Sequence, residues 1–94
     1  MHIEKLSSDF IIDNDHGVHA RPGAYLVQVL KPYSSDVTVS NCNKSDVFVN
    51  AKSLIKLMSL GIKKGHRVRF NIEGEDAQLA LNALKAAFQD NLGE

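Results

Sequence analysis

Residues 67–88, RVRFNIEGEDAQLALNALKAAF, carry the clearest structural pattern in the sequence. Val68, Phe70 and Ile72 alternate with polar residues, which predicts a strand with one buried and one solvated face. Glycine and acidic residues then form a turn, and Asp76 is expected to cap the helix that follows. The apolar residues of this helix recur at a spacing typical of one buried face: Ala77, Ala80, Leu81, Leu84 and Phe88. The stretch therefore predicts a strand joined to a helix that covers a sheet.

Upstream of this stretch, the same two patterns recur as short segments. Residues 10–12, with Leu6 before them, indicate a first strand that ends at the poor strand formers of residues 13–15. Residues 20–31 have helical spacing, and Pro32 ends that helix. Its apolar stripe consists of Gly23, Leu26, Val27 and Leu30.

The middle of the chain contains two short strands and a second helix. Residues 37–39 and 47–49 are expected to be strands, joined by a turn at residues 41–46 that includes Cys42. Ser53 is expected to cap the next helix and Gly61 to end it. The apolar face of this helix is predicted to comprise Leu54, Leu57 and Met58.

The predicted order of elements is β-α-β-β-α-β-α. Alternation in the strands indicates that one face of the sheet is covered and the other is solvated. Three helices on one face of a four-stranded antiparallel sheet give an α+β fold, an open-faced two-layer β-sandwich.

Composition excludes several classes of protein. The chain has 94 residues, enough for one domain, and equal numbers of acidic and basic residues. A balanced charge argues against nucleic acid or a membrane surface as a partner. We expect no membrane insertion, and the N-terminal residues lack a secretory signal pattern. A single cysteine cannot form an internal disulfide, so a cytoplasmic, reducing compartment is the simplest interpretation.

Residues 16–23, HGVHARPG, place a histidine where the first helix is predicted to begin. The free N–H groups and the dipole at a helix N-terminus favour an anion, here through the backbone of Ala20 and Arg21. Arg21 adds a guanidinium that suits phosphate oxygens, and Pro22 fits a position whose N–H would be unpaired. Gly17 permits a backbone conformation in the turn that other residues rarely adopt. A neutral His19 imidazole in this place can accept a phosphoryl group and pass it on.

Other interpretations of these histidines remain open from the residues alone. A histidine near a helix start is often a capping or surface residue. His16 and His19 could also bind a metal, but no further Cys, Asp or Glu completes a familiar ligand spacing. We therefore expect no metal and no cofactor.

Two motifs resemble the HPr family, the histidine-containing phosphocarriers of the phosphoenolpyruvate-dependent sugar phosphotransferase system. Residues 16–23 are similar to the family's active-site signature, and residues 50–61, NAKSLIKLMSLG, to its second signature. The similarity covers nearly the whole chain. A finer resemblance, carried by residues 41–46, 63–67 and 92–94 and by Gly23, is to the HPr-like domain of fructose-specific diphosphoryl transfer proteins. In that case residues 1–9 are expected to include linker.

The resemblance implies a role for each matching residue. His19 corresponds to the histidine phosphorylated on Nδ1, Arg21 to the arginine that stabilises the phosphoryl group, and Pro22 to the motif's conformational proline. Ser53 corresponds to a serine that a kinase phosphorylates in some bacteria, although capping alone explains it. The surface that docks enzyme I and enzyme IIA corresponds to Leu54, Ile55 and Met58. We expect Ile55 to be exposed and at least one neighbouring apolar residue to be buried.

Two functions from different classes follow. The first is a monomeric, bacterial phosphocarrier, which takes a phosphoryl group from phospho-enzyme I and delivers it to a fructose-type enzyme IIA. Such a carrier is part of a phosphotransferase system and not a stand-alone enzyme. The second is a non-catalytic HPr-like module that only docks partners. Retention of His19, Arg21 and Pro22 favours the first.

A cluster of basic residues at 63–69 is the remaining candidate for a binding surface. Its members are Lys63, Lys64, His66, Arg67 and Arg69. Recognition of RNA by a sheet needs exposed aromatic residues, and Phe70 lies on the apolar side of its strand. We therefore expect a solvated turn and sheet edge.

Overall fold

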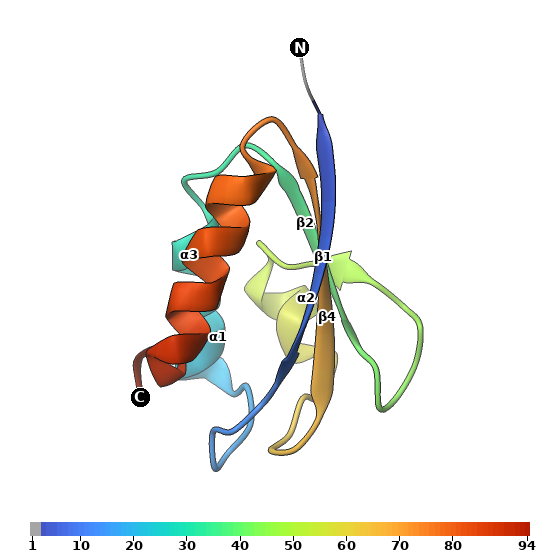
Figure 1. The fold of residues 1–94 in the computed structure, drawn as a ribbon. Helices are drawn as coiled ribbons and strands as arrows, with labels where there is room; N and C mark the ends of the chain where they lie inside the picture. The colour runs from blue at the N-terminus through green and yellow to red at the C-terminus, as the bar shows by residue number, and fades with distance from the viewer. Residues whose placement is uncertain (1–2) are drawn as a thin grey trace.

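The computed structural model describes residues 3–94 as a four-stranded sheet covered on one face by helices (Figure 1). The chain runs β1 (Glu4–Ile11), α1 (Ala20–Leu30), β2 (Asp36–Asn41), β3 (Val49–Asn50), α2 (Leu54–Met58), β4 (Arg67–Gly74) and α3 (Ala77–Gln89), and ends in the short 3-10 turn η1 (Asn91–Gly93). The order of elements and the fold class predicted from the sequence are confirmed.

The sheet is antiparallel throughout, with the strand order β1-β4-β2-β3. β4 is central and pairs with β1 and β2 along its length, in a register that places Phe10 opposite Val68 and Val39 opposite Phe70. Alternation in β4 is strict: Val68, Phe70 and Ile72 are buried and the residues between them are exposed. This alternation turns one whole face of β4 toward the helices.

The hydrophobic core lies between the sheet and the helices. α1 contributes Leu26 and Leu30, and α3 contributes Ala80 and Leu84, all with 0–1% of their surface exposed. Phe88, which is only partly buried, stacks on Phe10 with ring centroids 4.1 Å apart. Burial of these side chains is the main stabilising contribution to the two-layer arrangement.

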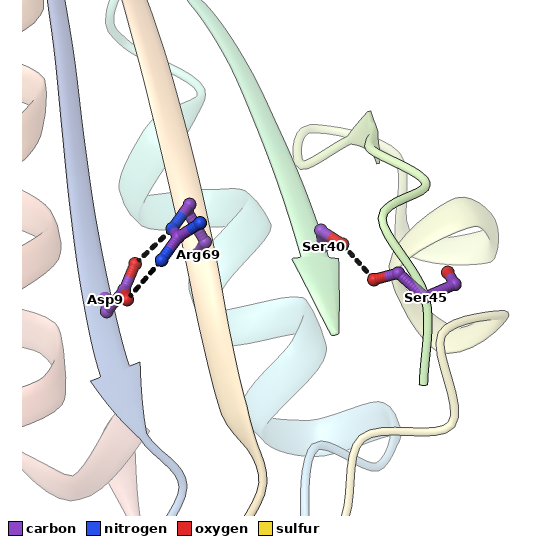
Figure 2. A network of polar contacts seen from close by, with 4 residues as sticks. All are labelled: Asp9, Ser40, Ser45 and Arg69. Carbon is purple, nitrogen blue, oxygen red and sulfur yellow. Dashed lines mark hydrogen bonds and ion pairs between the residues drawn. The ribbon is translucent and has the colours of Figure 1, made fainter. Parts of the chain in front are cut away.

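The open face of the sheet is polar (Figure 2). Arg69 on β4 donates to both carboxylate oxygens of Asp9 on β1, at 2.7 and 2.9 Å, and this pairing lowers the pKa of Asp9. At the end of β2, the hydroxyl of Ser40 donates to the carbonyl oxygen of Ser45. The side chains of the Asp9–Arg69 pair are partly exposed to solvent, whereas Ser40 is buried.

Three boundaries differ from the sequence expectation. The first strand covers Glu4–Ile11, so residues 4–9 belong to the sheet, while residues 1 and 2 of the expected linker lie outside the described residues. β2 is longer than predicted and includes Asn41. β3 contains only Val49 and Asn50, because these two residues alone have partners on β2. The preceding Val47 is 61% exposed.

Asp76 occupies the N-cap position of α3, but its side chain does not cap that helix. Its carboxylate accepts from the N–H of Ser34 at 2.8 Å, from the N–H of Ser35 at 2.9 Å and from the Ser35 hydroxyl. These hydrogen bonds, that of the Ser35 side chain first, lower the pKa of Asp76 to about 2. Asp76 therefore ties α3 to the segment before β2, a partner that local sequence does not indicate.

No helix among residues 3–94 is long and apolar enough to cross a membrane.

Candidate functional site

The turn between β1 and α1 holds His19 in a fixed place. Gly17 has a φ of +66°, and a Cβ there would lie 2.2 Å from the carbonyl oxygen of Ile62. The next residue, Val18, is buried and donates its N–H to the same oxygen at 3.1 Å. The glycine thus permits a close approach between two backbone segments, and that approach positions the residue immediately before α1.

His19 is the N-cap residue of α1. Its backbone is extended, with φ −85° and ψ −168°, and its side chain makes no capping hydrogen bond to the first turn of α1. Its carbonyl oxygen accepts from the N–H of Gly23 at 2.9 Å. The imidazole, 39% exposed, is therefore not engaged in capping the helix that follows it.

The first turn of α1 provides an anion site beside this ring. The N–H groups of Ala20 and Arg21 precede the first intrahelical hydrogen bond, so they are available to an external acceptor. Pro22, the third residue of α1, has no N–H that would be left unpaired in this turn, and it is buried. Arg21 is exposed, and within residues 3–94 its guanidinium has no ion-pair or hydrogen-bond partner. A phosphoryl group bound at His19 would meet two backbone donors and the Arg21 guanidinium.

The two histidines of the motif lie close together, which raises the question of a metal site. The His16 and His19 rings have centroids 6.1 Å apart and meet nearly edge to face. Among the described residues no group of three or more His, Cys, Asp or Glu side chains is arranged to hold a metal ion.

The structure adds two residues that the sequence analysis did not assign to the site. A side-chain oxygen of Glu94 lies 3.2 Å from Nε2 of His19. The buried amide of Asn14 donates to the other oxygen of Glu94 at 3.1 Å and to the carbonyl oxygen of Asn91 at 3.0 Å. Asn14 lies within a run of ordinary turn formers, and its partners are 77 and 80 residues away, so no local pattern could reveal the contact.

The second signature forms α2, which packs against α1. Ser53 caps α2 by accepting from the N–H of Lys56 at 3.3 Å, as predicted. Only Leu57 of this helix is fully buried; Ile55 is 82% exposed, and Met58, expected on the buried face, is 38% exposed. A five-residue helix has too few turns to bury all its apolar residues, so Ile55 and Met58 form an apolar surface.

Close contact between the two helices depends on Gly23. A Cβ at that position would lie 3.0 Å from Cδ1 of Leu54 and 3.4 Å from the sulfur of Met58. The apolar surface of α2 and the first turn of α1 therefore belong to one side of the molecule. The structure brings together the two motifs, which lie far apart in the sequence.

Two of the basic residues in and after the turn before β4 pair with aspartates. Lys64 contacts Asp15 at 3.0 Å, which lowers the pKa of Asp15, and Arg69 is held by Asp9. Nδ1 of His66 accepts from the N–H of Lys63 at 3.0 Å. These two exposed ion pairs are typical of a solvated turn and sheet edge.

Fold and site together define a class of open-faced α+β domains that present one histidine and one arginine at the start of a helix. Residues 6–90 match the family model described as PTS HPr component phosphorylation site, where PTS is the phosphotransferase system. The chain belongs to the HPr family of phosphotransferase-system phosphocarriers.

Individual relatives agree with this assignment. The multiphosphoryl transfer protein of Salmonella typhimurium is 47% identical over 89 residues, which are 95% of this chain and 24% of that protein. The phosphocarrier protein HPr of Xylella fastidiosa is 36% identical over 89 residues, covering 95% and 97% of the two chains. Among solved structures, HPr-C-His from Thermoanaerobacter tengcongensis has a TM-score of 0.84 and 38% identity, covering 95% and 97%. The chain thus spans 17–24% of the length of the five multiphosphoryl transfer proteins it matches.

Proposed function

We propose that this chain carries a phosphoryl group on Nδ1 of His19, taking it from phospho-enzyme I and passing it to an enzyme IIA. The observation that supports this most directly is the His19 imidazole, exposed and unused for capping, beside the free N–H groups of α1. His19 lies within the residues that match the family model of an HPr phosphorylation site, which supports the proposal.

Each neighbouring residue has a defined part in this proposal. Arg21 and the N–H groups of Ala20 and Arg21 stabilise the phosphoryl oxygens, and Pro22 fixes the start of the helix. A carrier must leave the donor protein before it can meet the acceptor protein, so docking has to be brief and reversible. Weak, fast association is therefore expected of the partner surface.

The partner surface in this proposal consists of Leu54, Ile55 and Met58. It lies on the same side of the molecule as the start of α1, since Leu54 and Met58 flank Gly23. Exposed apolar residues next to a reactive group suit a transient protein partner. Ser53 stands at the start of this helix, so phosphate added there would place charge beside the apolar surface and oppose docking.

The sugar and the protein context are inferred from the relatives. Five multiphosphoryl transfer proteins are 47–48% identical to this chain, compared with 36% for the Xylella fastidiosa HPr. This favours an HPr-like domain, residues 1–94, that serves a fructose-type enzyme IIA, either fused to it or as a separate monomer. We place this activity in the cytoplasm, where its partners would act.

A second candidate is a module that docks regulatory partners without carrying phosphate. The exposed apolar surface of α2 alone would be sufficient for that role. It would not need a histidine whose side chain is unused for capping, nor an arginine two residues later that pairs with no group among residues 3–94. This is the reason to prefer the carrier.

The test is intact mass after incubation with phosphoenolpyruvate, Mg²⁺ and a catalytic amount of enzyme I. The carrier should gain about 80 Da in an acid-labile form, and His19→Ala should gain nothing. His16→Ala is the matched control, because it removes the neighbouring ring and should still gain the mass. No gain by the wild-type chain with an enzyme I that phosphorylates a known HPr would refute the carrier function.

A further inference from the structure

The segment at residues 59–66, which joins α2 to β4, contacts the turn that carries His19. The carbonyl oxygen of Ile62 accepts from the N–H of Val18 at 3.1 Å. Gly17 approaches the same oxygen so closely that a Cβ there would lie 2.2 Å away. Since Val18 immediately precedes His19, the conformation of the 59–66 segment determines where the start of α1 lies.

The 59–66 segment is held from its other side by Asn41, at the end of β2. Asn41 is 1% exposed, so its amide must find partners within the protein. Its side-chain oxygen accepts from the N–H of Asn43 at 3.1 Å, which identifies the other amide atom as the nitrogen. That nitrogen donates one hydrogen to the carbonyl oxygen of Leu60 at 3.1 Å. Its second hydrogen is left for Nδ1 of His66, 3.1 Å away.

His66 closes the 59–66 segment with the same ring nitrogen. Nδ1 also accepts from the N–H of Lys63 at 3.0 Å, so two donors converge on it. A ring nitrogen that accepts carries no proton, and the neutral ring therefore has its hydrogen on Nε2. The backbone around the ring is fixed as well: the N–H of Ile12 donates to the carbonyl oxygen of His66 at 2.9 Å, and the N–H of Gly65 to that of Ile12 at 2.8 Å. One imidazole thus connects the 59–66 segment to the ends of β1 and β2.

We propose that His66 is a positioning residue for His19. Its Nδ1 acceptor holds the 59–66 segment in place, and the hydrogen bond from Val18 to Ile62 passes that constraint to the start of α1. Without this acceptor, one hydrogen of the buried asparagine amide and one backbone N–H would lose their partner, which favours a shift of the segment. This inference rests on the proposed carrier function.

The first test is NMR of the ¹⁵N-labelled chain. At alkaline pH, where the imidazole is neutral, the long-range ¹⁵N–¹H spectrum should show the Nε2–H tautomer of His66 in about 10-fold excess or more, the effect of the hydrogen bonds to Nδ1. His66→Ala should shift the amide resonances of Val18 and His19. His66→Asn should return them toward the wild-type positions, because its side-chain oxygen can accept from the same donors.

The second test is the rate of phosphoryl acceptance from phospho-enzyme I. His66→Ala should lower the maximal rate by about 3- to 10-fold, the effect of one lost hydrogen bond. The KM of enzyme I for this chain should stay unchanged, because buried Leu57 and the Ser53 cap hold α2 independently of His66. His66→Asn should accept the phosphoryl group at nearly the wild-type rate.

Two variants in the same segment are matched controls. Gly65→Ala should lose stability through its positive φ of +88° without removing a partner of Nδ1, so it separates a loss of stability from a displaced His19. Lys63→Ala keeps the N–H that donates to Nδ1 and removes only an exposed side chain. Both should keep the wild-type rate and the wild-type resonances of Val18 and His19.

The outcomes separate this proposal from the carrier function. Unchanged Val18 and His19 resonances and an unchanged rate in His66→Ala, with normal phosphorylation of the wild type, would overturn the role of His66 alone. An equal fall in rate for His66→Ala and Gly65→Ala would also overturn it, by showing a general effect of stability. So would a His66→Asn variant as slow as His66→Ala, because the acceptor would then not be the cause. A wild-type chain that accepts no phosphoryl group would overturn both proposals.

Discussion

Replacement of Gly17 with alanine should destabilise the fold by about 3 kcal/mol and slow phosphoryl acceptance by His19. At a φ of +66° a side chain costs about 1 kcal/mol. The added Cβ would lie 2.2 Å from the Ile62 oxygen, against about 3.4 Å for an ordinary contact, so the two backbones must separate by roughly 1 Å. That movement breaks the hydrogen bond from the Val18 N–H to Ile62 and loosens the buried Val18 side chain, at about 1 kcal/mol each.

Gly65→Ala provides the matched control. Gly65 also has a positive φ, +88°, but, apart from its two chain neighbours, no described residue has an atom within 4 Å of the place that a Cβ would take. It should therefore lose only the conformational contribution, about 1 kcal/mol.

Urea unfolding followed by far-ultraviolet circular dichroism measures both losses. Stability of about 5–14 kcal/mol is typical for 94 residues, so both variants should remain folded without denaturant. The rate of phosphoryl acceptance should fall for Gly17→Ala and stay unchanged for Gly65→Ala. Equal losses of stability in the two variants would refute the argument from close approach.

Three further predictions concern α2 and the tie between α3 and the sheet. Asp76 has its pKa lowered to about 2, so its stabilising contribution is complete above pH 3.8 and is lost as the pH falls through about 2. Asp76→Asn should therefore flatten the acid limb of a plot of unfolding free energy against pH, and an unchanged limb would contradict this. Leu57→Ala should lower the free energy of unfolding in urea by about 2–5 kcal/mol, because Leu57 is 1% exposed. Ile55→Ala should leave stability unchanged and weaken docking to enzyme I, measured as a higher KM of enzyme I for this chain. Ser53→Ala should lower the free energy of unfolding by about 1 kcal/mol through the lost helix cap. Ser53→Asp should keep the cap but raise the KM of enzyme I for this chain, because it places a negative charge beside the apolar surface. An unchanged KM in Ser53→Asp would contradict this charge effect.

Local pattern was sufficient for elements whose structure depends on near neighbours. The alternation of Val68, Phe70 and Ile72 predicted β4, because side chains of a strand alternate between its two faces. Ser53 predicted the start of α2, because a capping side chain acts on N–H groups only a few residues away. Predicted boundaries were wrong where pairing decided them. β3 shortened to Val49 and Asn50, since β2 offers partners to those residues only.

The sequence by itself determined the layers of the fold and the presence of His19 and Arg21 at a helix start, because both follow from short-range spacing. Tertiary structure alone decided what surrounds that histidine. Asn14 and Glu94 meet beside it only after η1 folds back onto α1, across 80 residues of chain. The role of Asp76 changed for the same reason, from a helix cap to an acceptor for Ser34 and Ser35. A hydrogen-bond partner that is distant in the sequence depends on which segments the core brings together, and a pattern of neighbouring residues does not encode that.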